Sequence, residues 1–463
     1  MADDLGHRAT RHAVVIGGSL AGLLAARVLA EHAERVTVVE RDRIPEGPEA
    51  RPGVPQGRHL HVLIAGGQRA LDELLPGFMA ELGELGAPRV GAPSDMVQWQ
   101  GGRWFRRMPA ATHYSTGPRP QLEWLVRQRV LADPRIELIE GHETVGLIGD
   151  SSRVRGIRLR ERGAGTEKEP RVLEADLVVD ASGRSTKAAD WLAGIGAEAP
   201  HEETLDTGLA YSTRVYRSTA GTPDTDALGY FIVPNPSQTY SGVILPLGDG
   251  RHLVTLSGLR GDEPPTEEGA FEEYAKRLPH PVVSDWLAAA EPVSPVYGFR
   301  KTANIRRRYD RPGRRPAGFL ATGDALCTFN PIYGQGMAVA ALSAVALRRA
   351  LADPKRTATT RRVQRAMLDA SRQAWDISAG ADKKMPGATG DAARPAPMDK
   401  VLGWYLHRVE ERAAGDPAVD TPFRGAITLA TPLTSLFAPA VAKAVLFGPV
   451  HATPAEPPLR RDA

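Results

Sequence analysis

The residues whose types and spacing could support chemistry lie in three separated segments. The first is a glycine loop at residues 17–22, in which Ser19 stands where the pattern G-x-G-x-x-G has its middle glycine. Glu40 lies 18 residues after Gly22, where an acid can accept hydrogen bonds from ribose hydroxyls. We therefore expect this segment to bind a nucleotide through these residues: Gly17, Gly18, Ser19, Leu20, Ala21, Gly22, Glu40 and Arg41.

The other two segments contain an aspartate close to a glycine, directly after an apolar run. Asp180 and Gly183 follow the run at residues 177–179, and Gly323 and Asp324 follow the run at 318–322. A carboxylate at Asp324 can accept from the hydroxyls of a ribitol chain. Further along, Pro331 and Gly334 shape a tight loop, and Gly336 and Met337 open a helix.

The helix that begins at Gly336 provides the strongest indication of the cofactor. Its first N–H groups would lie where a reduced isoalloxazine ring carries negative charge. An NAD dehydrogenase has no use for this second helix end, and an acid at Glu40 favours FAD or NAD over NADP. The three segments together predict bound FAD.

The elements that must position these residues can be predicted from hydrophobic patterns. Residues 13–16 and 36–39 are short β-branched runs with an Ala/Leu-rich helical stretch between them, which is one βαβ unit. Between about 207 and 302 apolar and polar residues alternate, as in a half-exposed antiparallel sheet. We predict an α/β fold: a Rossmann-like FAD-binding domain with an inserted antiparallel β-sheet substrate domain and a helical C-terminal region.

The expected domain boundaries follow from these changes of pattern. The FAD-binding domain is discontinuous and comprises residues 1–88, 113–200 and 303–352. Residues 89–112 and 201–302 form the substrate-binding domain, and residues 353–463 form the C-terminal region.

Composition excludes several classes of protein. The 463 residues carry 58 Lys and Arg against 55 Asp and Glu, and no nucleic-acid-binding module surrounds the arginine runs, so residues 306–308 are interpreted as solvated loop charge. Cys327 is the single cysteine, which excludes an intramolecular disulfide and a cysteine-bound metal. No secretory signal or membrane span is evident, so we expect a cytoplasmic protein. The apolar residues 427–447 are interpreted as a packed helical pair, with contact to a membrane surface as the alternative.

Over residues 13–351 the chain resembles the group A flavoprotein monooxygenases, the family of p-hydroxybenzoate hydroxylase and squalene epoxidase. Residues 180–184 resemble its D-G motif, and residues 324–336 resemble its G-D motif. The resemblance implies reduction of FAD by NAD(P)H, then addition of O₂ at C4a, which yields a hydroperoxyflavin that transfers oxygen to a substrate. A second dinucleotide fold is absent, and so is the Trp-x-Trp-x-Ile-Pro stretch of flavin halogenases.

Two shorter stretches resemble the actinobacterial polyether epoxidases, such as the lasalocid and monensin enzymes. They are residues 52–61 and the start of the helix at Gln121, preceded by Arg119. By that resemblance Arg58 and Arg119 contact the FAD phosphates. It favours epoxidation of an alkene in a hydrophobic secondary metabolite, a polyketide or terpenoid-like compound of the kind made in antibiotic biosynthesis.

The sequence alone does not identify the catalytic side chains. Candidates for the substrate pocket are His59, His61, Tyr211, Arg214, Phe329, Asn330 and Pro331. Alternative functions are hydroxylation of an aromatic polyketide or prenylated phenol, flavin-dependent reduction of prenyl chains, and flavin binding without catalysis. The sequence does not show whether the electron donor is NADH or NADPH, whether a separate flavin reductase takes part, or what the oligomeric state is.

Overall fold

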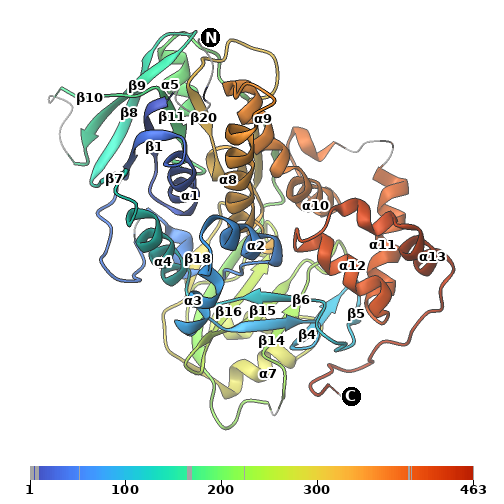
Figure 1. The fold of residues 1–463 in the computed structure, drawn as a ribbon. Helices are drawn as coiled ribbons and strands as arrows, with labels where there is room; N and C mark the ends of the chain where they lie inside the picture. The colour runs from blue at the N-terminus through green and yellow to red at the C-terminus, as the bar shows by residue number, and fades with distance from the viewer. Residues whose placement is uncertain are drawn as a thin grey trace.

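A parallel β-sheet forms the centre of the larger part of the molecule in the computed structural model, which describes residues 5, 10–51, 53–163, 169–223, 225–394, 397 and 399–461. Its strand order is β20-β11-β1-β2-β7, and every neighbouring pair is parallel. The strands are β1 (Thr10–Ile16), β2 (Ala33–Val39), β7 (Ile136–Ile139), β11 (Leu177–Asp180) and β20 (Phe319–Ala321). This sheet is the predicted Rossmann-like unit (Figure 1).

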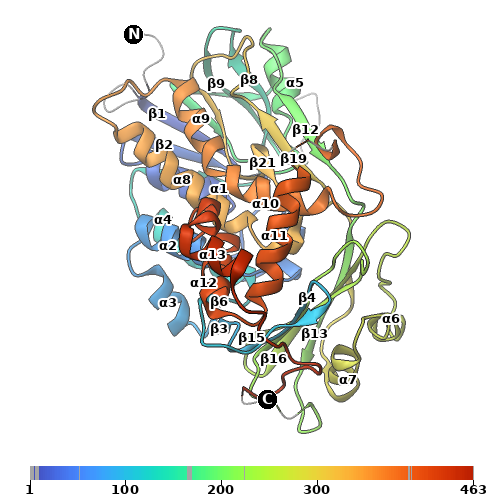
Figure 2. The same ribbon diagram turned by 90° about the vertical axis from the view of Figure 1, so that its right-hand side faces the viewer.

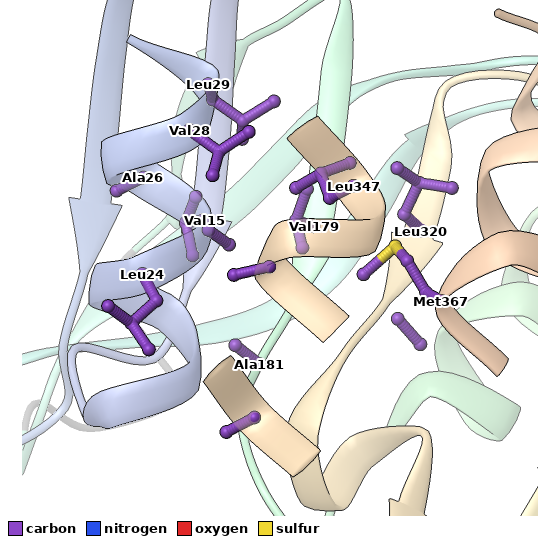
Figure 3. Close-up of a cluster of buried hydrophobic side chains, with 14 of the residues drawn as sticks. Val15, Leu24, Ala26, Val28, Leu29, Val179, Ala181, Leu320, Leu347 and Met367 are labelled. Carbon is purple, nitrogen blue, oxygen red and sulfur yellow. The ribbon is translucent and has the colours of Figure 1, made fainter. Parts of the chain in front are cut away.

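Helices cover this sheet and seal its core. The helix α1 (Leu20–Leu29) packs against the long helix α8 (Gly336–Ala352), which also contacts α2 (Ala65–Leu74) and α9 (Thr360–Ala370). Figure 3 shows Leu24 and Val28 of α1, Val179 of β11 and Leu347 of α8 in one cluster, and none of these four side chains is more than 1% exposed. The remaining helices of this part are α3 (Phe78–Glu84), α4 (Arg119–Leu131) and α5 (Ala188–Gly194).

The register of the parallel sheet brings the three predicted cofactor segments to one edge. Ile16 at the end of β1 pairs with Val39 of β2 on one side and with Asp180 of β11 on the other, and Asp180 pairs with Ala321 of β20. The residues that follow these four positions therefore lie in a row at the carboxyl ends of the strands, where open α/β sheets bind their ligands.

A second sheet forms the lower part of the molecule in Figure 1, with strand order β17-β13-β16-β15-β14-β4-β5 and β18 paired to β13. Its strands are β4 (Met96–Gln100), β5 (Arg103–Trp104), β13 (Ala210–Arg217), β14 (Gly229–Ile232), β15 (Ser241–Gly248), β16 (Arg251–Gly258), β17 (Glu291–Pro292) and β18 (Tyr297–Phe299). All pairs are antiparallel except β14 with β4. The helices α6 (Ala270–Ala275) and α7 (Val282–Ala289) pack against it.

Three smaller sheets complete the fold. They contain β8 (His142–Gly149), β9 (Val154–Glu161) and β10 (Arg171–Glu174); β12 (His201–Leu205), β19 (Asn304–Arg308) and β21 (Cys327–Thr328); and β3 (Arg89–Ala92) with β6 (Thr112–Ser115). The interpretation of residues 306–308 as loop charge is wrong. They lie in β19, and their guanidinium groups pair with Glu202 and Glu203 of β12, because antiparallel pairing sets the two strands side by side.

The C-terminal region is helical, as predicted, and lies along both large sheets (Figure 2). It contains α10 (Arg372–Asp382), α11 (Asp399–Ala413), α12 (Pro417–Ile427) and α13 (Pro439–Phe447), with a 3₁₀ turn η5 (Leu433–Phe437) before α13. The predicted helical pair at 427–447 corresponds to the end of α12, η5 and α13. Among the described residues, no helix is long and apolar enough to cross a membrane. The predicted α/β fold class is confirmed.

Candidate cofactor and substrate site

The glycine loop between β1 and α1 is held by close backbone contacts. Gly17 has φ +105°, and a Cβ added there would lie 2.4 Å from the Ala181 carbonyl oxygen. A Cβ on Gly22 would lie 1.8 Å from the carbonyl oxygen of Gly17. Ser19 donates its hydroxyl to Glu123 Oε1 at 3.0 Å and does not cap the helix, so the first N–H groups of α1 have no side-chain acceptor.

Glu40 closes the nucleotide end of the site. Its Oε2 accepts from the Gly18 N–H at 2.9 Å, and its Oε1 accepts from the Asp42 N–H at 2.9 Å. The buried guanidinium of Arg51 lies 2.8 Å from Oε2 of Glu40 and within 4.0 Å of Glu123. Sequence reasoning missed Arg51, which lies in a Pro/Gly-rich stretch without a motif, and it places a positive charge beside the glycine loop.

Asp180 shapes its own turn. Its Oδ1 accepts from the N–H of Ser182 at 2.9 Å and from the Ser182 hydroxyl at 2.6 Å, and its Oδ2 accepts from the Thr186 hydroxyl at 2.5 Å. Burial raises the pKa of Asp180, and these hydrogen bonds oppose the rise. Gly183 follows with φ +89°. Because Asp180 is 0% exposed and already accepts three hydrogen bonds within its own turn, this segment would contribute to a cofactor site through its backbone.

Asp324 has the opposite surroundings. No described residue donates a hydrogen bond to its carboxylate, and burial raises its pKa, a rise that the charges of Arg119, Arg184 and Arg307 oppose. Gly323 beside it has φ +56°, and an added Cβ would lie 2.5 Å from the Cβ of Ala21 on α1. The third segment therefore contacts the first, and its carboxylate is available to a hydroxyl-rich ligand.

Arg307, a second residue that sequence reasoning missed, ties two of the segments together. It is 6% exposed and donates to the carbonyl oxygens of Asp324 at 3.1 Å and Ala325 at 3.2 Å, and to that of Arg184 at 3.3 Å. Its Nε donates to Glu202 at 2.7 Å. One buried cation thus fixes the loops that follow β11 and β20.

The loop before α8 presents unsatisfied polar groups. The amide of Gln335 is 1% exposed, and neither its nitrogen nor its oxygen has a hydrogen-bond partner among the described residues. Gln335 does not cap α8 with its side chain, so the N–H groups that follow, from Gly336 and Met337, are open. Gly334 turns the chain at φ +64°, where an added Cβ would lie 2.6 Å from Val62.

These features fit FAD. Buried polar groups in proteins are nearly always hydrogen-bonded, so the Gln335 amide requires a partner other than the described residues. The half-buried carboxylate of Asp324 is open to the same ligand. Two uncapped helix N-termini, those of α1 and α8, suit a pyrophosphate and an anionic ring edge respectively. The protein supplies matching groups at both ends of such a cofactor.

A chain of polar contacts links the glycine loop to the second sheet. Arg119 Nε donates to Glu123 Oε1 at 2.8 Å, and its Nη1 donates to His61 Nε2 at 3.0 Å. The other ring nitrogen of His61 therefore carries the proton and donates to the carbonyl oxygen of His59 at 3.0 Å. The ring of His59 contacts the Thr213 hydroxyl at 3.0 Å. Burial and Arg58 lower the pKa of His59 to about 4, so its ring is neutral at pH 7.

The remaining arginines proposed for the cofactor lie further out. Arg58 is exposed, with its guanidinium 5.1 Å from the ring centroid of Tyr297. Arg41 is exposed after Glu40. Pro52, which begins the stretch similar to polyether epoxidases, lies outside the described residues.

The alternation of β13 separates the pocket candidates on it. Tyr211 faces His59, with ring centroids 4.9 Å apart. Arg214 faces α6 on the other side of the sheet, where it donates to Glu272 at 2.9 Å. Phe329 packs into the core of the parallel sheet, and Asn330 donates to the buried carboxylate of Asp382 at 2.9 Å.

A large cavity of about 1640 Å³ lies between the second sheet, the loop before α8 and the C-terminal helices. Sheet-side lining residues include Leu60, Val62, Met96, Tyr114, Phe231 and Leu245. The loop contributes residues 331–335, and the C-terminal region contributes Leu406, Phe423, Ile427, Leu433 and Leu436. Of the predicted pocket residues only Pro331 is among the lining residues, and the C-terminal wall carries no signal in the sequence.

Comparison with known proteins shows which family this chain belongs to. Residues 10–381 match the family described as "FAD binding domain". The chain is 36% identical over 352 residues to Protein Rv3254 of Mycobacterium tuberculosis, covering 73% of each chain. It is 28% identical over 348 residues to 6-methylpretetramide 4-monooxygenase of Streptomyces rimosus, covering 72% of this chain and 73% of that protein. A triple mutant of the flavin-dependent brominase Bmp2 shares the fold, with a TM-score of 0.66 at 13% identity over 92% of this chain and 96% of its own.

Proposed function

Because the chain belongs to the FAD-binding-domain family of flavin-dependent monooxygenases, we propose that it uses NAD(P)H and O₂ to insert one oxygen atom into a large hydrophobic secondary metabolite. The observation that carries this proposal is the cavity of about 1640 Å³, which reaches the loop that opens α8. Small-molecule sites usually measure about 300–1,000 Å³, so this cavity suits a substrate larger than one ring.

The residues assigned to the cofactor follow from the row at the edge of the parallel sheet. The N–H groups at the start of α1, with Arg51 beside them, would hold the pyrophosphate, and Glu40 would accept from the adenosine ribose. Asp324 would accept from the ribitol hydroxyls. The N–H groups of Gly336 and Met337, with the amide of Gln335, would hold the polar edge of the ring.

The bound FAD supplies electron acceptance from the nicotinamide cofactor and activation of O₂. The protein's own part is positioning, charge stabilisation and exclusion of water. The start of α8 stabilises negative charge at the ring edge, and the apolar cavity wall keeps water from the reacting carbon. His59 and His61 are neutral and engaged with Thr213 and Arg119, so they hold the interface between the two sheets.

Ring hydroxylation of a polycyclic aromatic polyketide is the reaction we favour. Similarity over 348 residues to a protein named 6-methylpretetramide 4-monooxygenase supports it, as does a cavity wide enough for fused rings. Epoxidation of an alkene is the second candidate, because residues 52–61 resemble the polyether epoxidases. Of that stretch, Leu60 lines the cavity, while His59 and His61 are used in contacts within the protein.

The test is a direct comparison of substrate classes. FAD-loaded protein is incubated with NADH or NADPH in air, together with 6-methylpretetramide or a linear polyene polyketide, and products are measured by mass. We expect a product heavier by one oxygen from the aromatic substrate. A reduced product that forms without O₂ would instead identify a flavin-dependent reductase, and an oxygenated polyene alone would establish epoxidation.

A further inference from the structure

Polar side chains interrupt the apolar wall on the sheet side of the cavity; besides Gln100, they include Gln98 and Tyr114. Gln98 lies on β4 and Tyr114 on β6, and both line the cavity. The C-terminal helix α12 packs against β6 directly behind them. Residues 417–427 of this helix lie beyond residue 381, where the match to the FAD-binding-domain family ends.

Behind this pair lies a buried arginine. Arg424 of α12 is 1% exposed; it donates from Nη2 to Gln98 Oε1 at 3.0 Å and from Nε to Asp420 at 2.9 Å. Its guanidinium also lies 5.6 Å from the ring centroid of Phe105. Since Gln98 donates its own amide N–H to Gln100 at 2.6 Å, both ends of that amide are occupied.

The phenol of Tyr114 is the polar group that this arrangement leaves open. Burial raises its pKa, and the positive charge of Arg424 opposes the rise. The phenol O–H can donate one hydrogen bond and so needs an acceptor. No described residue provides one, although buried tyrosine hydroxyls usually have a partner.

We propose that Tyr114, supported by Arg424, is a specificity-determining residue that donates a hydrogen bond to a carbonyl or other acceptor oxygen of the substrate. The positive charge of Arg424 makes the phenol O–H a stronger donor, because it favours negative charge on the phenol oxygen. The cavity then selects oxygenated polycyclic compounds over hydrocarbons of the same shape. This inference rests on the proposed function, since it assigns the substrate class of that same cavity.

Binding of 9-fluorenone and fluorene tests this directly, because the two differ only in a carbonyl against a methylene. Equilibrium dialysis against FAD-loaded protein, without NAD(P)H, gives both dissociation constants. We expect the wild type to bind fluorenone about 3- to 10-fold more tightly than fluorene, as one net hydrogen bond provides. Y114F should lose this preference while its affinity for fluorene stays the same.

The matched control is Y230F, which removes a hydroxyl from a tyrosine buried in the core of the second sheet, outside the cavity lining. It should keep the wild-type preference. Equal affinities in the wild type, binding of neither compound, or an unchanged preference in Y114F would overturn the proposal. The wild-type comparison decides even where Y114F fails to fold. The binding assay needs no turnover. A negative result would therefore overturn the role of Tyr114 without deciding whether the protein is a monooxygenase.

Discussion

Asp180 and Asp324 lie at or just after the ends of neighbouring strands, yet their carboxylates have different hydrogen-bond partners. Both carboxylate oxygens of Asp180 accept hydrogen bonds within its own turn, while the carboxylate of Asp324 accepts none from the described residues. Arg307 acts on the loops of both, because its guanidinium donates to a carbonyl oxygen beside each. At the scale of single residues, the site depends on buried arginines that hold backbone, as well as on the glycines and acids of the motifs.

Replacing Arg307 tests this role. R307Q should raise the dissociation constant for FAD about tenfold or more, because hydrogen bonds from a charged group to two loops are lost. Isothermal titration of the apoprotein with FAD measures the change. R308Q is the matched control on the same strand, since Arg308 pairs with Glu203 and Asp310 and contacts neither loop. Equal effects of the two substitutions would remove the special role of Arg307.

His59 predicts how stability depends on pH. Its pKa is lowered to about 4 by burial and by Arg58, against an ordinary value of 6.5, so the folded state favours the neutral ring. Stability from this residue is present above pH 6.5 and is lost as pH falls toward 4. At pH 5 the loss amounts to about 2 kcal/mol at most.

Chemical denaturation at pH 7.5 and pH 5 measures this dependence. H59N should show a smaller loss of unfolding free energy between the two pH values than the wild type, because the titrating ring is gone. H407N, at an exposed position on α11, should behave as the wild type does. A wild type whose stability does not change between these pH values would contradict the assignment of a neutral His59.

At the scale of elements, the parallel strands could be predicted because each is a short apolar run that ends in glycine or an acid. The fold class could be predicted from these strands. The helix α4 and the start of α8 could also be predicted from the local sequence. Arg307 was not, since its partner Arg184 lies 123 residues away in sequence and its strand looks like a run of surface charge. The faces of β13 could not be assigned either, because a shift of one residue exchanges them.

The loop before α8 depends on an element beyond it, the helix α10. Asp382 at the end of α10 is 2% exposed and accepts from Asn304, Asn330 and the Tyr333 hydroxyl, each within 2.9 Å. These hydrogen bonds fix the loop that lines the cavity and leads into α8. The helix therefore positions a wall of the cavity and the loop proposed to hold the ring end of the cofactor.

D382A should lower the free energy of unfolding by about 2–4 kcal/mol, because three buried donors lose their acceptor. It should also weaken FAD retention. D382N should cost less, since its amide oxygen still accepts and the Tyr333 hydroxyl can turn to accept from the amide nitrogen. Denaturation curves with FAD present and absent measure both effects. Equal destabilisation by the two variants would show that the negative charge matters more than the hydrogen bonds.

At the scale of the whole molecule, the cavity exists because three units meet: the parallel sheet with its loops, the second sheet, and the C-terminal helices (Figure 2). Arg424 joins Gln98 across 326 residues of sequence, which is why no local pattern predicts this wall. In the proposed function, the second sheet and the C-terminal helices would select the substrate, and the loops of the parallel sheet would hold the cofactor that oxidises it.

Narrowing the cavity from the C-terminal side should therefore change the accepted substrate and leave the cofactor in place. I427W adds bulk to a lining residue on α12, so turnover of a four-ring substrate should fall at least tenfold, with less effect on a single-ring phenol. I427V is the control that should retain the large substrate. Steady-state kinetics with flavin absorbance checks both properties, and loss of FAD from I427W would contradict the separation of the two sites.

The proposed function requires that this protein transfer one oxygen atom from O₂ by means of FAD bound at the three segments. Labelling with ¹⁸O₂ tests it most directly, with FAD-loaded protein, NAD(P)H and 6-methylpretetramide in unlabelled water. We expect one ¹⁸O atom in the product, and no oxygenated product from the apoprotein. Oxygen derived from water, or product formation without O₂ or without FAD, would contradict it.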